Sequence, residues 1–300
     1  MTNRTAVFFI AEGAHLTAQA ILLAASLRHH HGARDDLIAY VPSGADPIPD
    51  AAMIAFETLG VVVTPLAIDP TVWKSNYPHG NKIFACRAPR NAARHVFLDS
   101  DMVCVAPLDF ESVIQPGAVT VVPEGTPTWG KTGDRWARVY AFFGLPMPTE
   151  RVRLVRRRRI EFLPYFNAGM VGFCNDTNAK GQGFGDMWLE TAMIIDRDVA
   201  VGGKRPWVDQ ISLPISLKRM GLAYNALPDV WNFSISDRAL EPEARPRLIH
   251  YHSFRFGPVW PQFTAELDHM VATFGPDLMA RLTPHYGEHW FRKPNSEAVE

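Results

Sequence analysis

The chain has 300 residues, of which 47% are hydrophobic and 20% charged, and its formal net charge is −1. This composition is typical of a soluble globular protein, and the absence of a basic excess argues against a nucleic-acid-binding protein. Three widely spaced cysteines predict neither a disulfide framework nor a cysteine-based zinc site, so we expect a reducing, cytoplasmic setting. No apolar run is long enough to predict a transmembrane segment.

The first third of the sequence alternates short apolar strands with helical patterns. Strands are expected at 7–10, 37–41, 61–66 and 96–98, and helices at about 17–30, 53–59 and 81–93. This alternation is typical of an α/β fold with a Rossmann-like, mainly parallel sheet and helices on both faces. Later elements are an insertion or lid at 123–164, a strand at 166–173, helices at 183–195 and 207–220, the second broken or kinked near Pro214, and a strand at 248–252.

Two carboxylates follow the expected strand at 96–98, in the sequence Asp99-Ser100-Asp101. Residues two apart on an extended segment point to the same side, so both carboxylates can face one small volume. Their repulsion, about 4 kcal/mol at 4 Å near a protein surface, is relieved by a proton or a divalent cation. Because ligands collect at strand ends in α/β sheets and carboxylate oxygens suit Mg²⁺ or Mn²⁺, we interpret the pair as a metal–diphosphate site.

Three further groups of polar residues lie near expected strand ends or helix starts. Asn167, with a glycine two residues later, either admits a sugar ring or marks a β-bulge beside a satisfied asparagine. Asp209 and Gln210 open an expected helix, where they either favour the helix dipole or bind sugar hydroxyls near a reacting carbon. His250 and His252 alternate on an expected strand, and either could add an imidazole ligand to a metal site, although such pairs are more often structural.

Taken in order, these motifs resemble those of the GT-A glycosyltransferases. The resemblance is greatest to the family 8 group, which includes glycogenin and the bacterial lipopolysaccharide galactosyl- and glucosyltransferases. It covers about residues 5–260 and implies one GT-A domain with a mixed, mainly parallel central sheet. Within that domain we expect a nucleotide-binding half at about 1–115, a donor-sugar and acceptor half at about 116–265, and a C-terminal extension at about 266–300.

The resemblance implies a metal-dependent transfer of a sugar from a nucleotide-diphosphate donor, expected to be a UDP-sugar, to an acceptor hydroxyl. The residues implied to bind the donor are Glu12, Lys82, Asp99, Ser100 and Asp101. The implied ligands of Mn²⁺ or Mg²⁺ are Asp99, Asp101 and His252, with His250 as the alternative to His252. The acceptor would be a carbohydrate, a lipid-linked molecule or another small molecule.

Three residues are implied to act at the donor sugar and the reacting centre: Asn167, Asp209 and Gln210. We expect the transfer to retain the anomeric configuration, whereas an inverting enzyme would use Asp209 as the base. Two segments depart from the family pattern. The turn Ala11-Glu12-Gly13 lacks the Asp and Tyr typical of the group, and the late histidines are not followed by the usual H-x-x-G-x-x-K spacing.

Two other functions are open from the sequence. The run Asp99-Ser100-Asp101-Met102-Val103 also fits the nucleophile motif of haloacid-dehalogenase-like phosphatases, although that fold usually begins with the nucleophile strand. A non-catalytic sugar-nucleotide-binding protein would share the same polar residues.

Two basic segments are compatible with peripheral contact between the protein and a membrane. Arg151, Arg153 and Arg156–Arg159 form one of them, and Trp290, Phe291, Arg292 and Lys293 form the other. Solvated charge and terminal packing are the favoured interpretations.

Overall fold

The structure, a computed structural model, describes residues 2–156, 159–236 and 238–291. Arg157, Arg158, Arg292 and Lys293 therefore lie outside the described residues. The chain divides into two compact units, each made of segments that are separate in the sequence. The first unit comprises residues 2–3, Ala67–Phe97 and Phe110–Asp229, and the second comprises Arg4–Leu66, Leu98–Asp109 and the described residues from Val230 onward.

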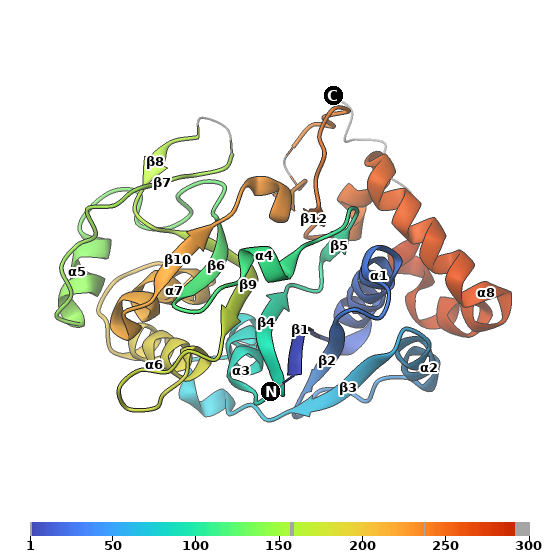
Figure 1. Cartoon of the computed structure of the whole chain (residues 1–300), viewed down its shortest axis with the longest axis horizontal. Coiled ribbons are helices and arrows are strands. Elements are labelled where there is room, and N and C mark those ends of the chain that lie inside the picture. Colours follow the sequence, from blue (N-terminus) through green and yellow to red (C-terminus); the bar gives the residue numbers. More distant parts are fainter. Residues whose placement is uncertain (1, 157–158, 237, 292–300) are drawn as a thin grey trace. The chain divides into compact units, whose positions relative to one another are not determined.

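The second unit carries parallel strands and a small separate sheet. Its elements are β1 (Thr2–Ile10, which starts in the first unit), α1 (Gly13–His31), β2 (Asp36–Pro42), α2 (Asp50–Thr58), β3 (Val61–Leu66), β5 (Met102–Cys104), β11 (Phe233–Ser234), β12 (Leu248–His250), the 3₁₀ turn η4 (Phe254–Val259) and α8 (Pro261–Trp290). Strands β1, β2 and β3 are parallel neighbours in that order, and β11, β12 and β5 form the small sheet. Helix α8 packs against α1 and α2 (Figure 1).

The first unit carries four neighbouring strands in the order β10, β6, β9 and β4. Its elements are the 3₁₀ turns η1 (Pro70–Val72) and η2 (Pro78–Gly80), α3 (Asn81–Arg87), β4 (Ala92–Leu98, which ends in the second unit), α4 (Phe110–Val113), β6 (Ala118–Pro123), α5 (Arg135–Phe142), β7 (Val152–Arg153), β8 (Glu161–Phe162), β9 (Phe166–Cys174), α6 (Phe184–Arg197), α7 (Val208–Met220), β10 (Ala223–Ala226) and η3 (Asp229–Trp231, which runs on into the second unit). Strand β10 is parallel to β6, and β6 is antiparallel to β9. Helices α6 and α7 lie side by side (Figure 1).

The predicted α/β class is confirmed, with mostly parallel strand pairs flanked by helices. The predicted helix at 81–93 is too long, because α3 ends at Arg87 and β4 begins at Ala92. Ala88 precedes Pro89, and a residue before proline is driven out of the helical region. Pro214 lies inside α7, which continues to Met220 without a break.

The segment 123–164 is anchored in a core. Helix α5, which lies in this segment, packs its Trp136 and Tyr140 in one apolar cluster with Tyr165 and with Ile211 of α7. Among the described residues, no helix is both long enough and apolar enough to cross a bilayer.

A buried carboxylate joins α8 to the end of α1. Glu266 is only 4% exposed, and its two oxygens lie 2.9 Å from His29 Nδ1 and 2.9 Å from His30 Nε2. The His29 ring stacks on His269, with 3.6 Å between ring centroids. A buried carboxylate is strongly disfavoured unless hydrogen bonds compensate its lost hydration, so this contact fixes how the two helices meet.

Glu266→Ala is expected to lower the free energy of unfolding by about 1–3 kcal/mol, because it removes the acceptor of both imidazoles. Urea unfolding measures the effect as a shift of the midpoint at an unchanged slope. Glu243→Ala is the control, since the Glu243 side chain is 94% exposed and should shift the midpoint little. Equal midpoints for the two variants would contradict the role of Glu266.

His95 is a buried histidine of β4 whose neighbours favour the neutral ring. Arg90 Nε donates to Nδ1 at 3.1 Å, and Nε2 lies 2.8 Å from the acceptor Asn175 Oδ1. Burial and, second, the Arg90 charge lower the pKa of His95 to about 4. The neutral tautomer with hydrogen on Nε2 satisfies both partners, whereas protonation would set an N–H against the Arg90 guanidinium.

Stability should therefore fall as the pH is lowered from about 6.5 toward 4, because the unfolded chain takes up the His95 proton first. We expect His95 to contribute about 1–3 kcal/mol to this loss. Urea midpoints measured across this pH range for the wild type and for His95→Gln should show a shallower pH dependence in the variant. Parallel pH profiles would refute the assignment.

Candidate active site

In the second unit, the pairing of β5 with β12 brings a carboxylate to two imidazoles. The strands are antiparallel, and Met102 is the partner of His250, so the preceding Asp101 lies beside this histidine. Asp101 Oδ1 is 3.1 Å from His250 Nε2, and Asp101 Oδ2 is 3.8 Å from His252 Nδ1. The two imidazole centroids are 3.8 Å apart. The predicted strand at 248–252 ends early, at His250, and His252 adopts a left-handed φ of 56°.

The partners of these rings indicate that the cluster suits a cation. His250 Nδ1 lies 2.8 Å from the oxygen of Asn232, which requires the ring hydrogen on Nδ1. The neutral ring then turns the lone pair of Nε2 toward the Asp101 carboxylate, so a proton or a metal cation is needed between them. His252 Nε2 is oriented by Ser234 Oγ at 3.0 Å, which leaves Nδ1 toward Asp101.

The donor atoms of Asp101, His250 and His252 lie within 4.8 Å of one another, which fits a divalent ion. One carboxylate with two imidazoles suits Mn²⁺ better than Mg²⁺, since imidazole is a transition-metal ligand. Among the described residues, this set does not include Asp99, whose backbone carbonyl accepts a hydrogen bond from Met102 N in the turn before β5.

Two other predicted donor-binding residues, Ser100 and Glu12, lie in the same unit. The buried Ser100 hydroxyl donates to the carbonyl of Ile10, at the end of β1. Glu12 directly precedes α1 in an extended conformation, and its side chain does not cap the helix.

In the first unit, Lys82 and Asp209 form a buried ion pair. Lys82 Nζ lies 3.4 Å from Asp209 Oδ2 and 3.4 Å from the carbonyl oxygen of Ala168. Their residues are 8% and 3% exposed, so both charges are largely withdrawn from water. Tyr77 completes the arrangement, since its hydroxyl lies 2.8 Å from Asp209 Oδ1 and accepts the Asp209 backbone N–H at 3.0 Å. Burial and the Asp209 charge raise the pKa of Tyr77 well above its usual value.

Asn167 is held at an irregularity of β9. The register between β6 and β9 shifts between Val121 and Val122, and Asn167 Oδ1 accepts the Gly169 backbone N–H at 2.9 Å. Its amide nitrogen donates to Glu124 Oε2 at 2.9 Å. The structure thus shows the irregular strand with a satisfied asparagine, and the admission of a sugar ring beside Asn167 stays a prediction.

Gln210 differs from its neighbours because its side-chain oxygen is available. The residue is 8% exposed, yet Oε1 has no hydrogen-bond partner among the described residues. Buried polar atoms are normally satisfied, so this oxygen fits a ligand that carries hydroxyl or amide hydrogens.

Tyr77 and Glu124 were not identified from the sequence. Tyr77 is 132 residues from Asp209, and Glu124 is 43 residues from Asn167. Neither belongs to a local motif, so no spacing signal links them to their partners.

The sequence matches the family model of the Rhodobacterales glycosyltransferase domain over residues 7–221. No curated protein matches the sequence. A solved structure of the galactosyltransferase LgtC, in complex with donor and acceptor sugar analogues, is similar with a TM-score of 0.58 and 12% identity, covering 92% of this chain and 99% of that chain. The glycosyltransferase GlyE of Streptococcus pneumoniae TIGR4 is similar with a TM-score of 0.52 and 14% identity, covering 96% of this chain and 64% of that one. These similarities confirm the predicted GT-A fold.

Tyr77→Phe is expected to lower the free energy of unfolding by about 1–3 kcal/mol, because it leaves a buried Asp209 oxygen and the Asp209 N–H without their partner. Urea unfolding measures the change. Tyr224→Phe is the matched control, since that half-buried hydroxyl has no hydrogen bond among the described residues and its loss should have little effect. A Tyr77 variant as stable as the control would show that the hydroxyl does not hold Asp209.

Proposed function

The chain belongs to the Rhodobacterales glycosyltransferase family, and we propose that it transfers a sugar from a nucleotide-diphosphate donor to an acceptor hydroxyl in a metal-dependent reaction. UDP is the proposed nucleotide, and a carbohydrate, lipid-linked or small-molecule hydroxyl is the proposed acceptor. The observation that carries the metal dependence is the set of one carboxylate and two imidazoles at Asp101, His250 and His252. The family match favours this reaction over the phosphatase and the non-catalytic binding protein.

The proposed metal ligands are Asp101, His250 and His252, whose donor atoms lie together, and Asp99, which the resemblance implies. A bound Mn²⁺ or Mg²⁺ supplies Lewis-acid neutralisation of the charge on a departing diphosphate. Asn232 and Ser234 orient the two imidazoles and so preserve the donor set. We further propose that Ser100 and Glu12 contact the donor nucleotide.

The proposed contacts to the donor sugar and the reacting centre are Lys82, Asn167, Asp209 and Gln210. Both oxygens of Asp209 are already engaged, by Tyr77 and Lys82, so this carboxylate is suited to binding and positioning rather than to proton abstraction. Gln210 offers a buried oxygen that has no partner among the described residues. These two observations support a retaining transfer over an inverting one with Asp209 as the base.

We propose a cytoplasmic setting for the protein. Cys86, Cys104 and Cys174 are all free thiols, which is the usual state in a reducing compartment. Burial raises the pKa of the Cys104 thiol to about 12, so this cysteine is chemically inert.

UDP together with Mn²⁺ should raise the melting temperature by several degrees, because a ligand at a hundredfold excess over its Kd stabilises a protein by about 2.7 kcal/mol. Asp101→Asn should abolish most of this shift. Asp268→Asn is the control, since it removes the same charge from an exposed position of α8 and should leave the shift intact. Differential scanning fluorimetry measures all three proteins, and a wild type that responds to neither UDP nor Mn²⁺ would rule the proposal out.

A donor panel then tests turnover. Release of free nucleotide diphosphate from one sugar nucleotide, increased by an acceptor, is the expected result. Binding of UDP without any such release across the panel would instead show a non-catalytic protein.

A further inference from the structure

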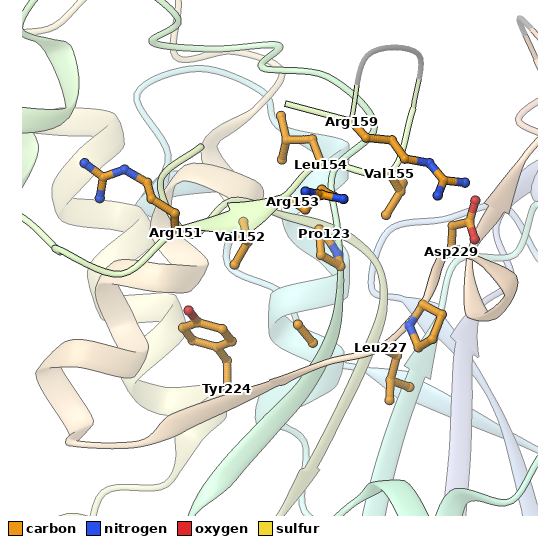
Figure 2. A pocket seen from close by; sticks show the side chains of 12 residues that line it. Pro123, Arg151, Val152, Arg153, Leu154, Val155, Arg159, Tyr224, Leu227 and Asp229 are labelled. Carbon is orange, nitrogen blue, oxygen red and sulfur yellow. The ribbon is translucent and has the colours of Figure 1, made fainter. Parts of the chain in front are cut away.

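A pocket in the first unit lies between the β7–β8 hairpin and β10, and it has a volume of about 490 Å³. We call it the arginine pocket. Its lining residues are Pro123, Arg151–Val155, Arg159, Tyr224 and Ala226–Asp229. Figure 2 shows Tyr224 rising from β10 toward the segment that carries Arg151 and Val152. The volume is in the range of small-molecule sites.

The lining of the arginine pocket combines apolar side chains with positive charge. Val152, Leu154 and Leu227 are buried apolar members, while three arginines face one carboxylate, that of Asp229. Two acidic residues near the pocket, Glu150 and Glu161, do little to offset this positive charge. Glu150 is paired with Lys218, and Glu161 opposes Arg153 in the hairpin register without an ion pair among the described residues. The pocket therefore suits an anion attached to a less polar body.

The three arginines differ in what holds them. Arg151 donates to the carbonyls of residues 148, 149 and 150, which fixes its side chain. Arg153 and Arg159 are exposed, and their guanidinium groups have neither a hydrogen bond nor an ion pair in the part of the chain that the structure describes. A guanidinium presents paired donors in a plane that matches a carboxylate or a phosphate, so these two groups can receive an anionic ligand.

Backbone contacts connect the arginine pocket to the proposed sugar-binding residues of the same unit. The N–H of Val155 donates to the carbonyl of Glu124 at 3.1 Å, and the N–H of Arg156 donates to that of Gly125 at 3.1 Å. The Glu124 side chain in turn accepts a hydrogen bond from the Asn167 amide nitrogen, and Glu124 directly follows the lining residue Pro123. The arginine pocket is thus adjacent in the chain to Glu124, whose side chain orients Asn167.

We propose that the arginine pocket binds the acceptor, and that the acceptor carries a carboxylate or phosphate recognised by Arg153 and Arg159. This inference rests on the proposed transferase function, whose acceptor class it specifies. The anion can belong to a free acidic sugar or to a lipid headgroup. An anionic acceptor also explains why a pocket with apolar walls keeps two guanidinium groups that have no partner among the described residues.

The test compares two probes that differ in charge, octyl β-D-glucuronide and octyl β-D-glucoside. Isothermal titration calorimetry should show at least tenfold tighter binding of the glucuronide to the wild-type protein. Arg153→Gln/Arg159→Gln should lose this preference, whereas Arg245→Gln/Arg281→Gln, which removes two exposed arginines elsewhere, should keep it. Near-UV circular dichroism checks that each variant is folded. Three results would overturn the proposal unless the vesicle experiment below shows arginine-dependent binding. They are equal binding of the two probes, binding of neither probe, and a preference for the glucuronide that survives in Arg153→Gln/Arg159→Gln.

A vesicle arm identifies the source of the anion. The wild-type protein is sedimented with pure phosphatidylcholine vesicles and with vesicles that also contain phosphatidylglycerol. Co-sedimentation with the second kind only, lost in Arg153→Gln/Arg159→Gln, assigns the anion to a lipid headgroup. Glucuronide binding without vesicle binding assigns it to a soluble acid. Binding in neither arm refutes the anionic acceptor. Both arms are independent of UDP and Mn²⁺, so a failure of the donor site is seen separately.

Discussion

The contact between the Lys82 ammonium and the Asp209 carboxylate is the constraint around which the first unit is arranged. Burial of either charge without a partner costs several kcal/mol, so each group that satisfies the pair has to be held in place. Tyr77 comes from the segment before η2, Lys82 from α3, Asp209 from the start of α7, and the Ala168 carbonyl from the irregular part of β9. One ion pair therefore ties four segments together.

In the second unit, too, one carboxylate brings several segments together, but its partners are imidazoles and not an ammonium group. The register of β5 with β12 sets Asp101 beside His250, and the left-handed residue His252 returns a second imidazole to the same carboxylate. Asn232 and Ser234 then decide which nitrogen of each ring faces Asp101. Backbone pairing thus brings the carboxylate and the two imidazoles together, while uncharged neighbours orient the rings.

The sequence identified what local patterns can carry. Three patterns can each be recognised within ten residues: a hydrophobic run before Asp99 and Asp101, Asn167 with a glycine two residues later, and a helix whose first turn carries Asp209. The same local patterns predicted too long a helix at 81–93, because the prediction followed the helical periodicity and ignored the effect of Pro89 on the residue before it. It also could not find Tyr77 or Glu124, whose roles depend on partners far away in the chain.

Local patterns in the sequence are enough to predict the α/β class, the family pattern and the residue types able to bind a metal and a sugar nucleotide. Which of these residues lie together depends on how the chain folds. Both histidines, not one, lie beside Asp101, and Lys82 neutralises Asp209. The Gln210 oxygen has no partner among the described residues. Burial and hydrogen-bond satisfaction are properties of the packed chain, because they are set by groups that no spacing in the sequence brings together.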